Sequence, residues 1–289
     1  MSRVAWSASR DARARRVQPH YIRPVCTLIF GLDVLGPRSV LVATNRDEDP
    51  ARASEPPQIL NRAPLVVGGR DAVAGGTWLA LRAGGPEAGS QRIEPGDRAA
   101  AEAEPAASVT TPGVAMLLNR RDPTPAKSGR RSRGLLTLDV ATAPDPRTRA
   151  LAEAEIGHYA PCSLVWLSPT GSWHLSIRAG RKPTLDKIAP GWHAITHFEL
   201  DDPADTRTTW VLTRLAGWRP SSRADAESRL SAILATHGGG GVPASCLHEG
   251  RAPTVSAAML WLAPGETSYR HAQGPPCVTP FEDWTHLLG

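Results

Sequence analysis

A short run of charged residues follows an apolar stretch early in the sequence, and its side chains could support a nucleophile or transfer protons. The run is Asn45-Arg46-Asp47-Glu48-Asp49, and Arg52 lies close behind it. An unpaired ion inside a protein costs several kcal/mol, so these charges must pair with one another, pair across the fold or lie in a solvated cleft. A charged turn that faces solvent also satisfies this pattern.

Two glycine-containing segments form a second feature that could belong to a site. Gly68-Gly69-Arg70-Asp71 is followed by Gly75-Gly76-Thr77-Trp78-Leu79. Glycine tolerates positive φ and lets another backbone or a ligand approach closely. The segments are therefore either two ordinary turns or the wall of a site, and composition alone does not separate these interpretations.

The spacing of cysteine and histidine matches no known metal or redox motif. The cysteines are Cys26, Cys162, Cys246 and Cys277, with no CxxC pair, and the histidines are dispersed. We therefore expect reduced thiols, no metal site, and small buried side chains at the last three cysteines. No glycine-rich phosphate loop is present, and we expect no cofactor.

Strands and helices must position these residues, and the apolar patterns predict where they lie. Residues 26–32 and 38–45 are apolar runs around a Gly36-Pro37 turn, which predicts a hairpin of buried strands. Further strands are predicted at 65–69, 77–81 and 113–119, hairpins over 163–177 and 257–274, and helices at 147–158 and 223–237. Local strand pairing with few intervening helices favours antiparallel sheets with helices outside, an α+β layered sandwich.

The 289 residues are 41% hydrophobic, enough for one large core. We expect a single domain over 26–289, with a flexible insertion at about 83–112 and a polar loop over 123–134. Residues 1–25 are rich in arginine but lack the apolar segment of a secretion signal. They are expected to be a disordered extension or to precede the true start of the chain.

The net charge of +5 raises the question of a nucleic-acid partner. The basic residues are nearly all arginine and are scattered along the chain, which favours solvated charge over a binding surface. No apolar run approaches the roughly 20 residues that cross a bilayer. These patterns predict a cytoplasmic protein without nucleic-acid or integral membrane contacts, and they leave the oligomeric state open.

Several of these motifs occur together in an order that resembles the NRDE family, the transport-and-Golgi-organisation proteins. The motifs that carry the resemblance are Val25-Cys26-Thr27-Leu28-Ile29-Phe30, Asn45-Arg46-Asp47-Glu48, Arg52 with Glu55-Pro56-Pro57, Gly68-Gly69-Arg70-Asp71 and Gly75-Gly76-Thr77-Trp78-Leu79. Weaker matches follow at Leu118-Asn119, Ser132-Arg133-Gly134-Leu135, Pro190-Gly191, Cys246-Leu247-His248 and Gly274-Pro275-Pro276.

The family is similar to the cysteine branch of the N-terminal-nucleophile hydrolases. The resemblance implies a four-layer αββα sandwich in which Cys26 is the nucleophile and its own α-amino group is the general base. It also implies that Arg46 and Asp47 hold the thiolate and the amine, with Asp49 as the less favoured alternative to Asp47. Cys26 must then be the first residue, so we expect a start at Val25 or removal of a propeptide.

The resemblance also has departures, and the one at Leu81-Arg82 concerns an oxyanion donor. The family pattern places asparagines where this chain has Leu81-Arg82 and His197, and an arginine where it has Val255. Asn119 or Arg82, together with backbone amides, is then the expected oxyanion donor. The predicted substrate pocket consists of Asn45, Glu48, Arg70, Trp78, Arg82 and His197.

The resemblance implies hydrolysis of a linear amide in a small acylated metabolite. The alternative is a non-catalytic binding or trafficking protein that uses the same pocket for a hydrophobic small molecule of the haem or acyl-lipid type. The missing asparagines favour the binding protein, whereas Cys26, Arg46 and Asp47 favour the enzyme.

Overall fold

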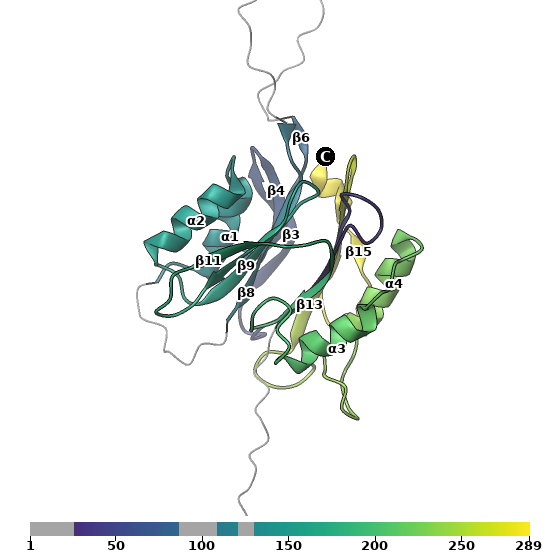
Figure 1. The fold of residues 1–289 in the computed structure, drawn as a ribbon. Coiled ribbons are helices and arrows are strands. Elements are labelled where there is room, and N and C mark those ends of the chain that lie inside the picture. The colour runs from purple at the N-terminus through teal and green to yellow at the C-terminus, as the bar shows by residue number, and fades with distance from the viewer. Residues whose placement is uncertain (1–25, 87–108, 121–129) are drawn as a thin grey trace, which may run out of the picture.

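The computed structural model describes residues 26–86, 109–120 and 130–289, and in these residues two antiparallel sheets lie face to face (Figure 1). The six-stranded sheet has the order β12-β1-β2-β13-β14-β15. Its strands are β12 (Gly191–Ile195), β1 (Thr27–Leu32), β2 (Val40–Asp47), β13 (Thr254–Ala263), β14 (Glu266–Ala272) and β15 (Glu282–Asp283). The seven-stranded sheet has the order β11-β10-β9-β8-β5-β4-β3. Its strands are β11 (Thr184–Lys187), β10 (Trp173–Ile177), β9 (Cys162–Leu167), β8 (Gly113–Asn119), β5 (Leu79–Arg82), β4 (Leu65–Asp71) and β3 (Ser54–Arg62).

The central strands are buried on both faces, which explains why their sequences are almost continuously apolar. In β1, Leu28 and Phe30 belong to the core between the two sheets, whereas Ile29 packs toward the helices on the other face. Successive side chains of a strand point to opposite faces, so a strand between two layers needs apolar residues at both parities. The β1–β2 hairpin predicted from the sequence is confirmed, with Leu28 opposite Thr44.

Two helices cover the outer face of each sheet (Figure 1). The helices α1 (Arg133–Thr142) and α2 (Pro146–Ile156) contact the seven-stranded sheet, and α3 (Thr206–Leu215) and α4 (Arg223–Leu234) contact the six-stranded sheet. A short 3-10 helix, Thr285–Leu288, follows β15. The layer order is therefore αββα, as expected.

Two of these helices were not predicted. α1 begins at Arg133, inside the segment expected to be a polar loop. α3 has the sequence TRTTWVLTRL, in which threonine and valine have low intrinsic helix propensity. Its buried Val211 and Leu215 pack against the six-stranded sheet, so tertiary contacts stabilise it. The predicted helices at 147–158 and 223–237 are confirmed as α2 and α4.

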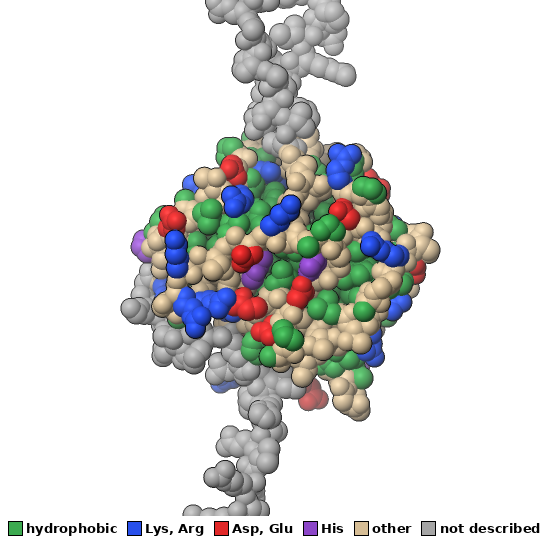
Figure 2. Space-filling view, viewed as in Figure 1, with side chains coloured by type: hydrophobic (Ala, Val, Ile, Leu, Met, Phe, Trp, Pro, Cys, Tyr) green, Lys and Arg blue, Asp and Glu red, His purple; other side chains and the backbone are tan. Residues whose placement is uncertain are grey.

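The ends of the expected insertion form a small two-stranded ribbon of β6 (Gly85–Pro86) and β7 (Val109–Thr110). Residues 87–108 between them lie outside the described residues, as do 1–25 and 121–129, so the flexibility predicted there is untested. Among the helices that the structure describes, none is both long enough and apolar enough to cross a bilayer. On the face drawn in Figure 2, basic and acidic side chains are interspersed.

Candidate active site

A pocket of about 250 Å³ lies where the two sheets meet at one end of β2. From the six-stranded sheet and the segment after β2, its lining residues are Cys26, Arg46, Asp47, Glu48 and Arg52. From the opposite side they are Asp71, Thr77, Trp78, Leu117, Asn119, Ser132, Arg133 and Gly134. The pocket thus joins the charged run, both glycine segments and the beginning of α1.

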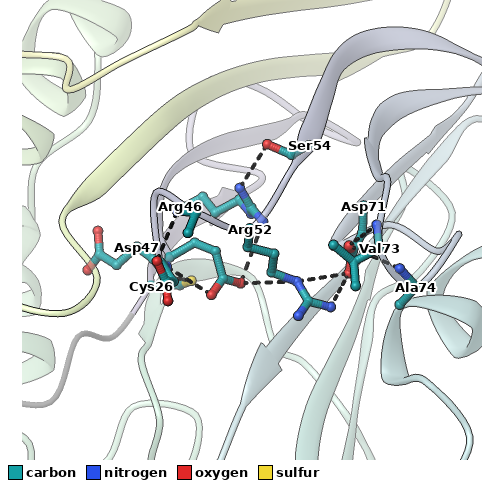
Figure 3. A network of polar contacts seen from close by, with 11 residues as sticks. Cys26, Arg46, Asp47, Arg52, Ser54, Asp71, Val73 and Ala74 are labelled. Atoms are coloured by element: carbon teal, nitrogen blue, oxygen red, sulfur yellow. Dashed lines mark hydrogen bonds and ion pairs between the residues drawn. The ribbon is translucent and has the colours of Figure 1, made fainter.

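Cys26 stands directly before β1 and packs against the core between the sheets. Its thiol donates a hydrogen bond to the backbone oxygen of Asp47, with a sulfur–oxygen distance of 3.7 Å (Figure 3). Burial raises the pKa of the Cys26 thiol to about 12, and the negative charge of Asp47 adds to this effect. In a chain that continues upstream of Cys26, the thiol is therefore protonated at neutral pH.

Arg46 extends into the same pocket because of strand pairing. Thr27 is opposite Asn45 in the β1–β2 ladder, so the preceding Cys26 and the following Arg46 fall on the same face. Arg46 is only 6% exposed, and its guanidinium donates to Ser54 Oγ at 3.3 Å. Burial lowers the pKa of Arg46, but arginine keeps its charge, and a fixed cation therefore stands beside the thiol.

Asp47 is bonded within its own sheet. Its Oδ1 accepts a hydrogen bond from Thr254 Oγ1 at 2.6 Å, and Thr254 is its partner in the β2–β13 ladder. Burial lowers the pKa of Arg207, in α3, and the charge of Asp47 is the leading interaction that opposes this shift. The carboxylate of Asp47 therefore sits at the pocket wall between a hydroxyl donor and a buried cation. Asp49, the less favoured alternative, is exposed and does not line the pocket.

A chain of ion pairs crosses the pocket from one sheet to the other (Figure 3). Glu48 lies 3.5 Å from Arg46 and 3.8 Å from Arg52, and Arg52 pairs with Asp71 at 2.6 Å. Burial acts to raise the pKa of Asp71, but hydrogen bonds from Arg52 and from the amides of Ala74 and Val73 more than offset it, so the pKa is lowered. The hydrogen bond to Asp71 raises the pKa of Arg52.

The glycine segments allow α1 to close the pocket. A Cβ added to Gly76 would lie 2.3 Å from the backbone carbon of Gly134, closer than any real contact. The amide of Thr77 donates to the backbone oxygen of Gly134 at 3.0 Å. Since glycine at position 76 permits this approach, α1 can bring Ser132 and Arg133 to the pocket wall.

Some predicted site residues line the pocket and others lie elsewhere. Cys26, Arg46, Asp47, Asn119, Glu48 and Trp78 line it. Asn45 is fully buried on the opposite face of β2, where its Nδ2 donates to the backbone oxygens of Leu234 and Ser245. The alternation along β2 that turns Arg46 into the pocket turns Asn45 toward the helices.

Arg70, Arg82 and His197 do not line this pocket either. Arg70 is exposed, because alternation along β4 places it on the face opposite its neighbour Asp71, which does line the pocket. Arg82 lies on the face of β5 that α1 covers, and its guanidinium donates to the backbone oxygens of Thr111 and Ala143. His197 packs its ring against Phe198, with 4.0 Å between centroids. No local pattern along these segments indicates which of their side chains meet the cavity.

Several residues that line the pocket were not predicted as site residues. Arg52, Asp71, Thr77 and Arg133 were part of motifs quoted for the family resemblance, which was the only signal for them. Burial lowers the pKa of Arg133, whose Nη1 donates to the backbone oxygen of Pro161 at 3.2 Å. No carboxylate in the described residues forms an ion pair with Arg133.

Fold and pocket together define an αββα sandwich protein whose candidate site contains a cysteine and an arginine in one pocket. Residues 26–88 match the family model described as Transport and Golgi organisation 2, so the resemblance predicted from the sequence is confirmed over this segment. No curated protein matches the chain in a comparison of sequences. Among solved structures, the chain is similar to a Caenorhabditis elegans N-acylethanolamine-hydrolyzing acid amidase (NAAA) ortholog, with a TM-score of 0.49 and 13% identity, covering 83% of this chain and 94% of that chain.

Proposed function

We propose that this protein hydrolyses a linear amide of a small acylated metabolite, with Cys26 as the nucleophile. The observation that carries the proposal is that the Cys26 thiol and the buried guanidinium of Arg46 line one pocket between the sheets. A cation next to a thiol favours the thiolate, the form that attacks carbonyl carbon. The pocket volume of about 250 Å³ suits a small substrate.

The chemistry requires that Cys26 be the first residue of the active form. With residues 1–25 attached, burial holds the thiol pKa at about 12, and the described lining of the pocket includes no histidine that could take the proton. A free α-amino group has an ordinary pKa of about 7.7–8.0 and would lie on the same residue as the thiol. Release of the upstream segment therefore supplies the general base.

The reaction then proceeds through a thioester. The α-amine takes the thiol proton while sulfur forms a bond with the carbonyl carbon of the substrate. The same amine passes the proton to the leaving nitrogen as the carbon–nitrogen bond breaks. Water next attacks the thioester carbon, and the carbon–sulfur bond breaks as one proton of the water passes through the amine to sulfur, so that the carboxylic acid leaves. Asn119 is the side-chain amide of the described lining that can donate to the oxyanion, together with backbone amides.

Arg133 directs the choice of substrate in this proposal. The other pocket arginines, Arg46 and Arg52, are paired with Glu48 or Asp71, whereas Arg133 forms no ion pair with any described carboxylate. A half-buried cation without an ion-pair partner is stabilised by an anionic ligand, and a guanidinium binds a carboxylate in a planar, bidentate way. The preferred substrate class is therefore an acylated amine that also carries a carboxylate, such as an N-acyl amino acid.

Binding without catalysis is the second candidate, favoured by the high thiol pKa of the chain that contains residues 1–25. The charged lining of the pocket argues for an amphipathic ligand with an acidic group over a wholly apolar one. In that case Arg133 and Arg46 bind the acidic group, and Cys26 contributes only packing.

The proposal is tested on two forms of the chain. One form includes residues 1–25, and the other begins at Cys26 after cleavage of a fusion partner. Both forms are incubated with a panel of N-acyl amino acids, and products and acyl-enzyme are measured by mass spectrometry. We expect turnover only from the form that begins at Cys26, and none from its Cys26→Ser variant. If that form is folded by circular dichroism and binds panel members without forming acyl-enzyme or product, the hydrolase proposal fails and the binding role replaces it.

A further inference from the structure

A second group of nucleophilic side chains lies outside the pocket, on two loops next to the six-stranded sheet. His237, Cys246 and His248 lie between α4 and β13, and Cys277 lies between β14 and β15. Their ring nitrogens and sulfurs all lie within 4.8 Å of one another. We call these four residues the Cys–His cluster. Cys277 was expected to be a buried apolar residue, but it is only half-buried and faces this cluster.

Four of the distances within the cluster lie within about 0.5 Å of the edges of a metal tetrahedron. Zinc bonds of about 2.3 Å to sulfur and about 2.0–2.1 Å to nitrogen imply edges of about 3.8 Å between sulfurs, about 3.3 Å between nitrogens and about 3.6 Å between unlike atoms. The two Sγ atoms are 3.6 Å apart and the two Nε2 atoms 3.2 Å. His248 Nε2 lies 3.9 Å from Cys246 Sγ and 3.1 Å from Cys277 Sγ.

Neither a disulfide nor a catalytic pair fits the cluster as well as a metal does. A disulfide would hold its sulfurs at about 2.05 Å, well below the observed separation of Cys246 and Cys277. A catalytic Cys–His pair needs one thiol and one imidazole, whereas here two of each converge on a common centre. Two thiolates and two neutral imidazoles, placed tetrahedrally, are the donor set that selects zinc among the common divalent ions.

We propose that the Cys–His cluster binds one zinc ion in a closed, structural site. Four protein ligands fill the coordination shell of tetrahedral zinc and leave no position for a substrate. Cys246 is buried, Cys277 is half-buried and the two histidines are exposed, so the ion lies at the surface, where it can enter. The metal cross-links the loop after α4 to the segment after β14.

The loop that carries Cys246 also supports the candidate active site. The backbone oxygen of its neighbour Ser245 accepts a hydrogen bond from Asn45 in β2. Leu247 donates from its amide to Thr254 Oγ1, which in turn donates to Asp47. The end of β2 is hydrogen-bonded to this loop, and zinc holds the loop in place. Loss of the metal therefore loosens the loop and weakens its support of β2.

Measuring metal content in the full chain tests the proposal. The chain is purified under reducing conditions, and zinc is counted by elemental analysis before and after dialysis with zinc alone. We expect about one zinc per chain. Replacing zinc with cobalt should give the absorption bands of tetrahedral, thiolate-ligated cobalt. A chelator should lower the unfolding temperature.

The control variants separate this site from the other thiols. Cys277→Ser and His237→Ala should each weaken zinc affinity more than about tenfold, a loss that even supporting residues of zinc sites can cause. His237 is exposed, so His237→Ala should retain the fold. This variant therefore provides the test if Cys277→Ser does not fold. Cys26→Ser also removes one thiol but lies outside the cluster, and it should keep its zinc.

Three results would overturn the proposal. The first is a reduced wild-type chain that takes up no zinc, and the second is a Cys26→Ser variant that loses zinc as completely as Cys277→Ser. The third is metal-free protein in which mass spectrometry shows a Cys246–Cys277 disulfide and in which the chelator does not change the unfolding temperature.

Discussion

The guanidinium carbon of Arg46 lies 4.3 Å from the centre of the Trp78 ring. Arg46 belongs to β2 of one sheet, and Trp78 directly precedes β5 of the other, so the contact bridges the two sheets across the pocket. A cation over an indole face is attracted by about 0.5–2 kcal/mol, with the larger values at desolvated sites. The ring thus restrains the same guanidinium that the proposed chemistry places beside the Cys26 thiol.

A double-mutant cycle measures this contact directly. Arg46→Gln and Trp78→Leu, singly and together, should give a coupling free energy of about 0.5–2 kcal/mol in urea unfolding. Arg46 keeps its hydrogen bond to Ser54 in the Trp78→Leu variant, so the cycle isolates the ring contact. Additive effects within experimental error would mean that the stacked geometry contributes no stability.

Cys26 should react slowly with an alkylating reagent in the chain that includes residues 1–25. Because burial raises the pKa of the thiol to about 12 in the chain that includes residues 1–25, almost no thiolate is present at neutral pH. Iodoacetamide should therefore label Cys26 at least about tenfold more slowly than a free thiol of pKa about 8.5. Peptide mapping assigns the label and separates Cys26 from Cys277. A labelling midpoint in this form at or below the pKa of about 8.5 of a free thiol contradicts the expectation.

Arg133 is expected to distinguish acidic substrates from neutral ones. In the form that begins at Cys26, Arg133→Gln should raise KM for an N-acyl amino acid about tenfold or more, because a charge-assisted pair contributes about 1.5–3 kcal/mol. KM for the corresponding amide, which lacks the carboxylate, should change little. Steady-state kinetics on the two substrates compare these values, and equal losses on both would remove Arg133 from substrate recognition.

Gly76→Ala should destabilise the fold more than Gly75→Ala. A Cβ at position 76 would collide with the backbone of Gly134, which cannot move without shifting α1, and overpacking of this kind costs about 1–3 kcal/mol or more. Gly75 has open space around its Cβ position but a φ of +73°, so alanine there costs about 1–2 kcal/mol of backbone strain. The denaturant midpoints of the two variants measure this difference. If Gly75→Ala were the less stable variant, α1 could shift to accommodate a side chain at position 76 at little cost.

Two buried histidines predict a loss of stability in acid. Burial lowers the pKa of both His174 and His271 to about 4, below the unfolded value of about 6.5. Between these pH values the unfolded chain binds more protons, so the free energy of unfolding falls as pH decreases through this window. Each histidine contributes a slope of up to about 1.4 kcal/mol per pH unit.

Substitution identifies the histidines responsible for this slope. Replacing His174 or His271 with glutamine should each reduce the slope of unfolding free energy against pH, measured from about 4 to about 6.5. His158→Gln, at an exposed position, is the matched control and should leave the slope unchanged. A slope that neither buried variant alters would assign acid sensitivity to other groups.

The sequence by itself determined the elements whose signals are local. Continuous apolar runs around Gly36-Pro37 predicted the β1–β2 hairpin, because strands between two layers must be apolar on both faces. The helix predicted at 147–158 is α2, which the structure extends by one residue to Pro146 with Asp145 as its cap. The ordered motifs around Cys26, Arg46 and Trp78 located the candidate site along the chain.

Only the tertiary structure decided which side chains meet in space. Arg46 and Asn45 are adjacent in sequence, yet Arg46 lines the pocket whereas Asn45 donates a hydrogen bond to the backbone oxygen of Leu234 in α4. The packing of the two sheets decides which face of β2 meets the pocket. Arg133 and Gly134 reach the pocket through the close approach of α1, which no periodicity in the sequence indicates. The Cys–His cluster combines residues of two separate loops, so no local spacing could predict it. Local patterns follow from hydrogen bonding and burial along one segment, whereas convergence of distant side chains depends on how layers pack, which is a property of the whole chain.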